Sequence, residues 1–302
     1  MRNRAAPIGG LLLLCALWAT ASLQRDLLPG WGSTVAPTLS GQAVPLALVA
    51  ATAGVLTLAR RKSFPGGRQF AIAILVGLGM FAAPAILLQL ANGSISDSTR
   101  VALFSLVPVF AVVLEPHLGS GGGNEGALGS ALVAVGGTLL LFPFELPQSL
   151  RDAAAWSGVL AAVVSIAATN CVAVRSARED RARSISAFAS IAAGSAAVVL
   201  GAVGAFLERG TGSILRMDIW TLPEVIALVL LFWLMTCMSA IAMTTRFLIA
   251  PLIANLIEVA ILRPRVSLRD WAGFLLIAAG TGWLLLVPQM KKGASTLKLD
   301  LT

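Results

Sequence analysis

Glutamate and asparagine side chains inside one apolar stretch are the strongest candidates for chemistry in this sequence. Glu258 lies three residues after Asn255, so the two side chains share a face if the segment is helical. Both follow Pro251 closely. A carboxyl group there could bind a cationic or amino group, or exchange a proton. The alternative is an interfacial glutamate paired with Arg263 or Arg265.

A second glutamate is related to the first by its distance from a proline. Glu115 lies seven residues after Pro108, as Glu258 lies seven residues after Pro251. Glu115 is next to the single histidine, His117, and is predicted to be solvated at the opposite end of the molecule. Glu115 and Glu258 are therefore candidate gates at the two ends of one pathway.

Other residues in the apolar stretches could line the same pathway. Polar side chains are costly within a bilayer and tend to face the protein interior or a pathway. Proline frees a backbone carbonyl that must face protein or a water-filled cavity, and tryptophan can stack on a planar or cationic solute. The remaining candidates are Trp18, Gln89, Ser105, Pro108, Thr169, Asn170, Trp233 and Pro251. Helix packing and bonding to the local backbone are the alternatives for these residues.

The composition argues against an enzyme. With one histidine and no tyrosine, the chain has little material for acid-base or metal chemistry. Cys15, Cys171 and Cys237 have neither metal-ligand spacing nor an even number for disulfides, so they are read as core residues. We therefore expect no metal and no cofactor. The formal charge of +8 does not indicate nucleic acid, because the basic residues occupy short gaps between apolar runs.

The elements that would position these residues are transmembrane helices. Hydrophobic residues make up 57% of the 302 residues and charged residues 12%, against about 25% charged in a typical soluble domain. A spanning helix needs about 20 mainly apolar residues. Ten segments qualify, approximately 8–23, 43–59, 69–91, 101–116, 126–142, 153–174, 184–207, 222–242, 245–262 and 269–287. The eighth and ninth are separated only around 243–246, where a tight cytoplasmic hairpin is expected.

The distribution of lysine and arginine predicts the orientation. With the N-terminus in the cytoplasm, fourteen of these residues, Arg246 among them, fall inside and eight fall outside. This bias favours an inner (plasma) membrane protein of bacterial type with both termini cytoplasmic. The alternative for the first segment is a signal peptide, with Arg2 and Arg4 before an apolar run; its cleavage would leave nine spans.

The sequence also contains an internal repeat. The fourth and fifth segments match the ninth and tenth in their prolines and glutamates, and in the spacing of Gly129 and Gly136 against Gly273 and Gly280. The repeat unit is therefore five helices, and an odd number gives the second copy the opposite orientation in the membrane. We expect an all-α integral membrane protein of ten helices in two inverted repeats, 1–145 and 146–302, with a cytoplasmic tail from about 289.

These features resemble the EamA-type transporters of the drug/metabolite transporter superfamily. The resemblance rests on Trp18 in a small apolar first helix, on Pro108 and Pro251, and on the two Gly-x6-Gly runs, and it covers about residues 8–287. It implies export of metabolites such as amino acids, or of drug-like compounds. Where such proteins usually carry Gly-Glu after the fourth and ninth helices, this chain has 119–120 as Gly-Ser and 262–263 as Leu-Arg. The chain thus resembles a divergent member of the family, and the substrates of the family are not assigned to it.

The function expected from the sequence is secondary transport. A small organic solute would bind near the bilayer midplane between the halves, which would expose it to each side in turn. No ATPase motif is present, so a proton or solute gradient would drive the movement. The alternative class is a non-transporting membrane scaffold, or a membrane-embedded enzyme acting on a lipid-linked substrate.

Overall fold

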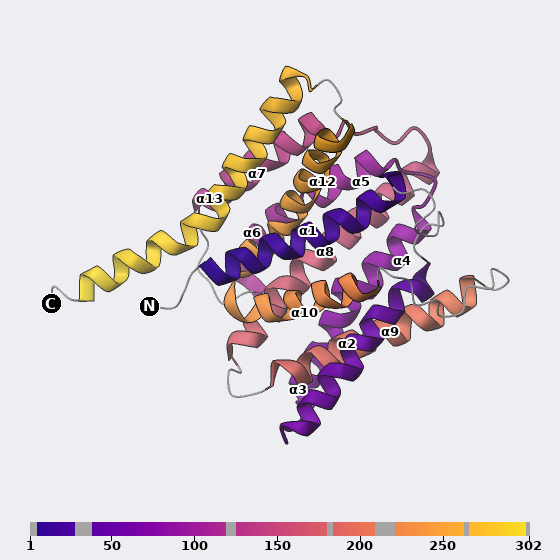
Figure 1. Ribbon diagram of the computed structural model, residues 1–302, viewed down its shortest axis with the longest axis vertical. Coiled ribbons are helices and arrows are strands. Elements are labelled where there is room, and N and C mark those ends of the chain that lie inside the picture. The colour runs from indigo at the N-terminus through magenta and orange to yellow at the C-terminus, as the bar shows by residue number, and fades with distance from the viewer. Residues whose placement is uncertain are drawn as a thin grey trace.

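The chain folds into helices throughout the part that the structure describes. The computed structural model describes residues 5–27, 38–118, 125–179, 184–208, 221–262 and 266–299 (Figure 1). The elements are α1 (Ala5–Leu27), α2 (Leu39–Ala59), α3 (Gly67–Gly77), the π-helical turn η1 (Leu78–Ala82), α4 (Ala83–Leu90), α5 (Asp97–Phe104), α6 (Val107–Leu118), α7 (Glu125–Leu141), α8 (Leu150–Glu179), α9 (Ile185–Leu207), α10 (Thr221–Cys237), α11 (Ala240–Thr244), α12 (Arg246–Leu262) and α13 (Leu268–Leu299).

The shorter pieces join into longer helical units. The elements α3, η1 and α4 follow one another without a gap. Only one or two residues separate α5 from α6, and α11 from α12. Over the described ranges this gives ten helical units, in the order of the ten apolar segments. Six of them are long and apolar enough to cross a bilayer: Leu39–Ala59, Gly67–Leu90, Asp97–Leu118, Leu150–Ala177, Ile185–Leu207 and Ala240–Leu262. The prediction of an all-α protein with helices suited to a membrane is confirmed.

The outer surface of the bundle is apolar, as a bilayer requires. Large hydrophobic side chains on its outer helices are exposed, including Leu58 at 66%, Val198 at 71% and Leu275 at 68%. The interior is built instead of many small side chains, with Ala131, Ala192 and other alanines completely buried. Without water to drive association, such small residues let helix backbones approach closely.

The eighth and ninth units are divided earlier than the sequence predicted. The hairpin expected around 243–246 is absent: α10 ends at Cys237, and α11 begins at Ala240. The hydroxyl of Ser239 accepts a hydrogen bond from the backbone N–H of Ala242, which caps α11 at its N-terminus. Consequently Arg246, which was counted as a loop charge, begins α12 within the core.

The internal position predicted for Pro108 also changes. A break at Ser105 and Leu106 separates α5 from α6, so Pro108 lies in the first turn of α6, where its missing N–H costs no helical hydrogen bond. Pro251, by contrast, lies inside α12.

Two helix pairs flank a central group. The most extensive packing is between α2 and α9 and between α7 and α13, at opposite edges of the bundle in Figure 1. Between them, α6 packs on α8, and α1 packs on both α10 and α12. The α7–α13 contact depends on glycine: a Cβ on Gly280 would lie 2.6 Å from the Ser130 carbonyl oxygen. Small residues of α7, Ser130 and Ala134, therefore form the surface on which Gly280 packs.

Candidate functional site

A cavity of about 650 Å³ lies between α12 and helices from the first half of the chain. The first half contributes residues of α1, α2, α4 and α5, together with Asn92 and Phe142. All the lining residues of the second half belong to one stripe of α12: Arg246, Phe247, Ala250, Pro251, Ala254, Asn255 and Glu258. Steps of three and four residues keep these side chains on one helix face. The volume is in the range of sites for small organic molecules.

The cavity has an exposed end and a buried end. At the exposed end, the side chain of Asp97 is 93% accessible, and Asn92 and Glu258 are also exposed. At the buried end, Arg246 is only 1% exposed. Between Arg246 and Glu258 the stripe runs along α12 for about 18 Å, at 1.5 Å per residue. The cavity therefore opens at one end of the helices, and Arg246 lies at its buried end.

Arg246 is held by neutral groups. Its Nη1 donates to the Asn170 side-chain oxygen at 3.0 Å and to the Met243 carbonyl at 2.9 Å. The guanidinium carbon lies 5.7 Å from the ring centroid of Trp18 and 4.6 Å from that of Phe247, which are favourable distances for cation–π attraction. The buried nitrogen Nε has no hydrogen-bond partner.

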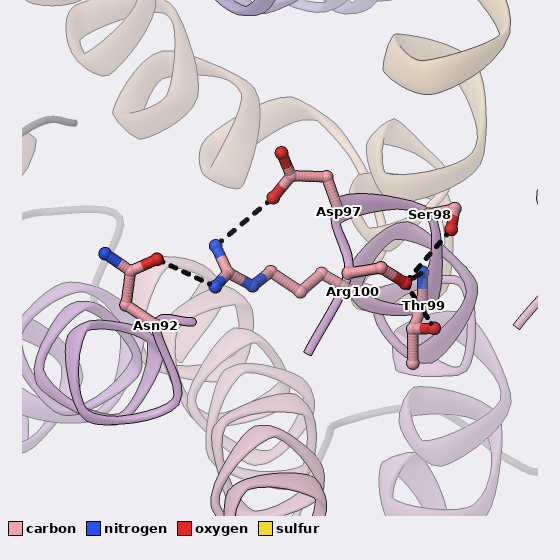
Figure 2. A network of polar contacts seen from close by, with 6 residues as sticks. Asn92, Asp97, Ser98, Thr99 and Arg100 are labelled. Atoms are coloured by element: carbon pink, nitrogen blue, oxygen red, sulfur yellow. Dashed lines mark hydrogen bonds and ion pairs between the residues drawn. The ribbon is translucent and has the colours of Figure 1, made fainter. Parts of the chain in front are cut away.

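The exposed end carries a polar network around Arg100. Figure 2 shows the Arg100 guanidinium between two side chains: it donates to Asn92 at 3.1 Å and forms an ion pair with Asp97 at 3.3 Å. The hydroxyl of Thr99 accepts from the backbone N–H of Glu145, which ties the start of α5 to the segment after α7. Because Asp97 is so exposed, this ion pair contributes little to stability.

Five of the predicted pathway residues line the cavity. Trp18 lies beside Arg246 at the buried end, Gln89 is on α4, and Pro251, Asn255 and Glu258 are on α12. Within the described residues Glu258 forms no hydrogen bond or ion pair. Its alternative partners, Arg263 and Arg265, lie outside the described residues.

The other predicted residues lie outside the cavity lining. Ser105 and Thr169 are buried and donate to carbonyls of their own helices, those of Ala102 and Ser165. Pro108 is buried in α6. Trp233 is 39% exposed on α10 and lies against Gly10 of α1. Asn170 is completely buried and reaches the site only through Arg246.

Glu115 is buried rather than solvated, contrary to the prediction. It is 8% exposed in α6, because α6 packs against α8 and turns this face inward. Glu258, at the related place in α12, is exposed.

The buried, charged residue of the cavity that the sequence analysis did not predict is Arg246. It was assigned to the cytoplasmic charges because it follows a short polar run, Thr244 and Thr245. A usable signal was present: Arg246 is the single charged residue between Glu224 and Glu258, and it precedes the repeated proline by five positions. An isolated charge in a long apolar stretch usually marks a functional position.

The cavity has a different set of polar groups at each end. Among the described residues, no group of three or more histidine, cysteine, aspartate or glutamate side chains could hold a metal ion. The buried end offers one guanidinium among aromatic rings, and the exposed end offers amides, carboxylates and Arg100.

Comparison with known proteins supports the fold alone. No protein-family model and no curated protein matches the sequence. A solved structure described only as "Crystal structure of protein" is similar, with a TM-score of 0.71 and 16% sequence identity, over 95% of this chain and 99% of that one. The two proteins therefore share a fold over nearly the whole of both chains.

Proposed function

We propose that this protein is a secondary transporter that moves a small organic solute across a membrane by alternating access. The observation that carries the proposal is the cavity: it lies between the two halves, is open at one end and closes at Arg246. A closed end inside a set of helices suited to a membrane is what a carrier requires and a channel does not. A scaffold would not need such a cavity, and an enzyme would need acid-base groups converging at its buried end.

The two halves are proposed to be inverted repeats. Several residue pairs of the same type stand the same 143 positions apart, among them Ser96 with Ser239, Phe104 with Phe247, Pro108 with Pro251, and Glu115 with Glu258. Both serines cap a helix. The helix packing has the same correspondence: α6 of the first half packs on α8 of the second half, and α12 of the second half packs on α1 of the first half. The related rings of Phe104 and Phe247 contact each other, with centroids 5.9 Å apart.

The repeat also supplies two versions of the cavity wall. The buried residues of α6 are Val107, Pro108, Ala111, Val112 and Glu115. Their equivalents 143 positions later are Ala250, Pro251, Ala254, Asn255 and Glu258, which all line the cavity. One stripe is thus packed closed while its counterpart is open. We propose that transport exchanges these two environments, and that both termini are cytoplasmic, so that the open side here is external.

This exchange predicts opposite accessibility for two related positions. We expect Asn255→Cys to react with a membrane-impermeant maleimide from outside, and Val112→Cys, 8% exposed in wild type, to react only from the cytoplasmic side. The background would carry replacements of Cys15, Cys171 and Cys237, and right-side-out and inside-out vesicles would be compared. Reaction of both positions from the same side would contradict alternating access.

The transport activity itself is tested in proteoliposomes. Counterflow would be measured against amino acids, nucleosides, sugars and cationic drugs, with protein-free liposomes as the blank. A saturable flux for one class supports the proposal. The absence of flux for every class, with the cysteine pair showing no exchange, would favour the scaffold.

Glu258 is the candidate for coupling to protons. Because it forms no hydrogen bond or ion pair within the described residues, Glu258→Gln should leave the folded protein as stable as wild type. If protons drive transport through this carboxyl group, the variant loses the dependence of flux on a pH gradient. An unchanged pH dependence of flux would remove Glu258 from the coupling mechanism.

A further inference from the structure

Among the residues that the structure describes, the buried charge of Arg246 has no negative partner. Its two hydrogen-bond acceptors, Asn170 and Met243, are neutral, and its Nε is buried without any partner. At the other end of the cavity, by contrast, Arg100 forms an ion pair with Asp97. An intramembrane arginine normally pairs with a carboxylate or several backbone carbonyls, because a bare charge is costly there. The ring faces of Trp18 and Phe247 compensate this charge only in part.

The acids of the cavity lie too far away to compensate Arg246. Glu258 is on the same helix about 18 Å along the axis, and Asp97 is 93% exposed and already paired. The cavity is therefore positive at its buried end and carries its carboxylates at the exposed end. Arg246 lines the buried end of the cavity, so an anion bound at that end would lie against this residue.

The surroundings of Arg246 select among anions. A guanidinium binds carboxylate and phosphate through paired N–H groups. Arg246 supplies a single positive charge at this end, which one carboxylate balances, whereas a phosphate dianion would leave an excess negative charge in the core. Trp18 and Phe247 lie next to the guanidinium, and Phe104 contacts the Phe247 ring. With Ala250, which also lines the cavity, these side chains suit an apolar or aromatic body.

An α-amino acid fits this end poorly. Its ammonium group lies within a few ångströms of its carboxylate, so it would be buried beside the guanidinium with no acid near it. Charged groups of like sign are costly at that distance in a low-dielectric site. We propose that Arg246 is the anchor of a binding site for small organic monocarboxylates that carry an apolar or aromatic body and no α-ammonium group. That such a monocarboxylate is also a transport substrate rests on the proposed function.

Binding to the purified protein tests the assignment without any transport. The probes are phenylacetate, its uncharged isostere phenylacetamide, phenethylamine, phenylalanine and inorganic phosphate, with titration followed by thermal stabilisation and calorimetry in detergent. We expect phenylacetate to bind and stabilise the protein, and the other four to bind at least about 30-fold more weakly, the loss typical of an unmatched buried charge. Equal binding of phenylacetamide, or preference for phosphate, phenylalanine or phenethylamine, would overturn the assignment.

Two variants act on the anchor in different ways. Arg246→Met removes the charge but keeps an apolar side chain, and Asn170→Asp places a carboxylate against Nη1 within the protein. Both should abolish phenylacetate binding while the unliganded protein remains at least as stable as wild type, because Arg246→Met removes the uncompensated buried charge and Asn170→Asp balances it. Arg269→Met, at an exposed arginine of α13, is the matched control and should bind as wild type does. Retained phenylacetate binding in either core variant would contradict the assignment.

The outcomes separate this inference from the proposed function. Arg246-dependent binding of phenylacetate without flux in proteoliposomes would keep the anion site and refute transport of this class of solute. Flux of a neutral or cationic solute that Arg246→Met leaves unchanged would keep transport and refute the anion site. A purely structural role for Arg246 would appear as a lower melting temperature of Arg246→Met and no effect of phenylacetate on wild type.

Discussion

Replacing Ala254 by tryptophan is expected to reduce solute flux to the background of protein-free liposomes while leaving the protein folded. Ala254 lies midway along the α12 stripe, between Arg246 and the exposed Glu258. Its side chain lines the cavity, so an indole ring at this position would project into the cavity volume. The ring would occupy the route to Arg246 in a cavity of about 650 Å³. It would also prevent this stripe from packing closed as the α6 stripe does.

The matched control lies on the same helix. Ala260 is an exposed residue of α12 outside the cavity lining, so Ala260→Trp carries the same added bulk away from the cavity. Flux would be measured by counterflow and folding by size-exclusion chromatography and melting temperature. Flux at the wild-type level in a well-folded Ala254→Trp protein would show that the cavity is not the solute pathway.

Adding one methyl group to Gly137 is expected to destabilise the protein by about 1–3 kcal/mol, the usual cost of overpacking a core. A Cβ at this position would lie 2.8 Å from each of three α13 atoms: the Gly273 carbonyl oxygen, the Ile277 backbone nitrogen and the Leu276 Cβ. Two of the three belong to backbone, which cannot move aside as a side-chain end can. The α7–α13 pair would have to separate to accept Gly137→Ala.

The adjacent glycine provides the control. A Cβ on Gly136 would meet nothing within 4 Å. Gly136→Ala should therefore stabilise α7 slightly, by about 0.5–1 kcal/mol, because alanine has the higher helix propensity. The free energy of unfolding of both variants would be compared by denaturant titration in mixed micelles. Equal stability of the two would mean that α7 and α13 do not pack as described.

Much of the architecture followed from the sequence. Apolar length alone located the ten helical units, because a helix in lipid must satisfy its own backbone hydrogen bonds within each segment. Trp18, Gln89, Asn255 and Glu258 line the cavity for a related reason: polar or amphipathic side chains in such segments are costly unless they face one another or water.

Arg246 could not be placed in the same way. Whether it lies in a loop or in the core depends on where the chain turns, and the turn is set by the Ser239 cap, which offers only one weak local signal. Its burial also depends on partners that are distant in the sequence, Trp18 and Asn170. The close approach at Gly137 and the open space at Gly136 likewise depend on α13, and nothing in the local sequence distinguishes the two glycines.

The sequence by itself determined that the chain forms helices suited to a bilayer and that α6 and α12 carry matching stripes with proline and glutamate at equivalent places. Only the tertiary structure decided which stripe is open. Equivalent sequences have nearly equivalent local energetics, so the choice depends on how the two halves pack against each other. In this structure that packing buries Glu115 and exposes Glu258, and it leaves Arg246 at the end of the cavity without a counter-charge from the described part of the chain.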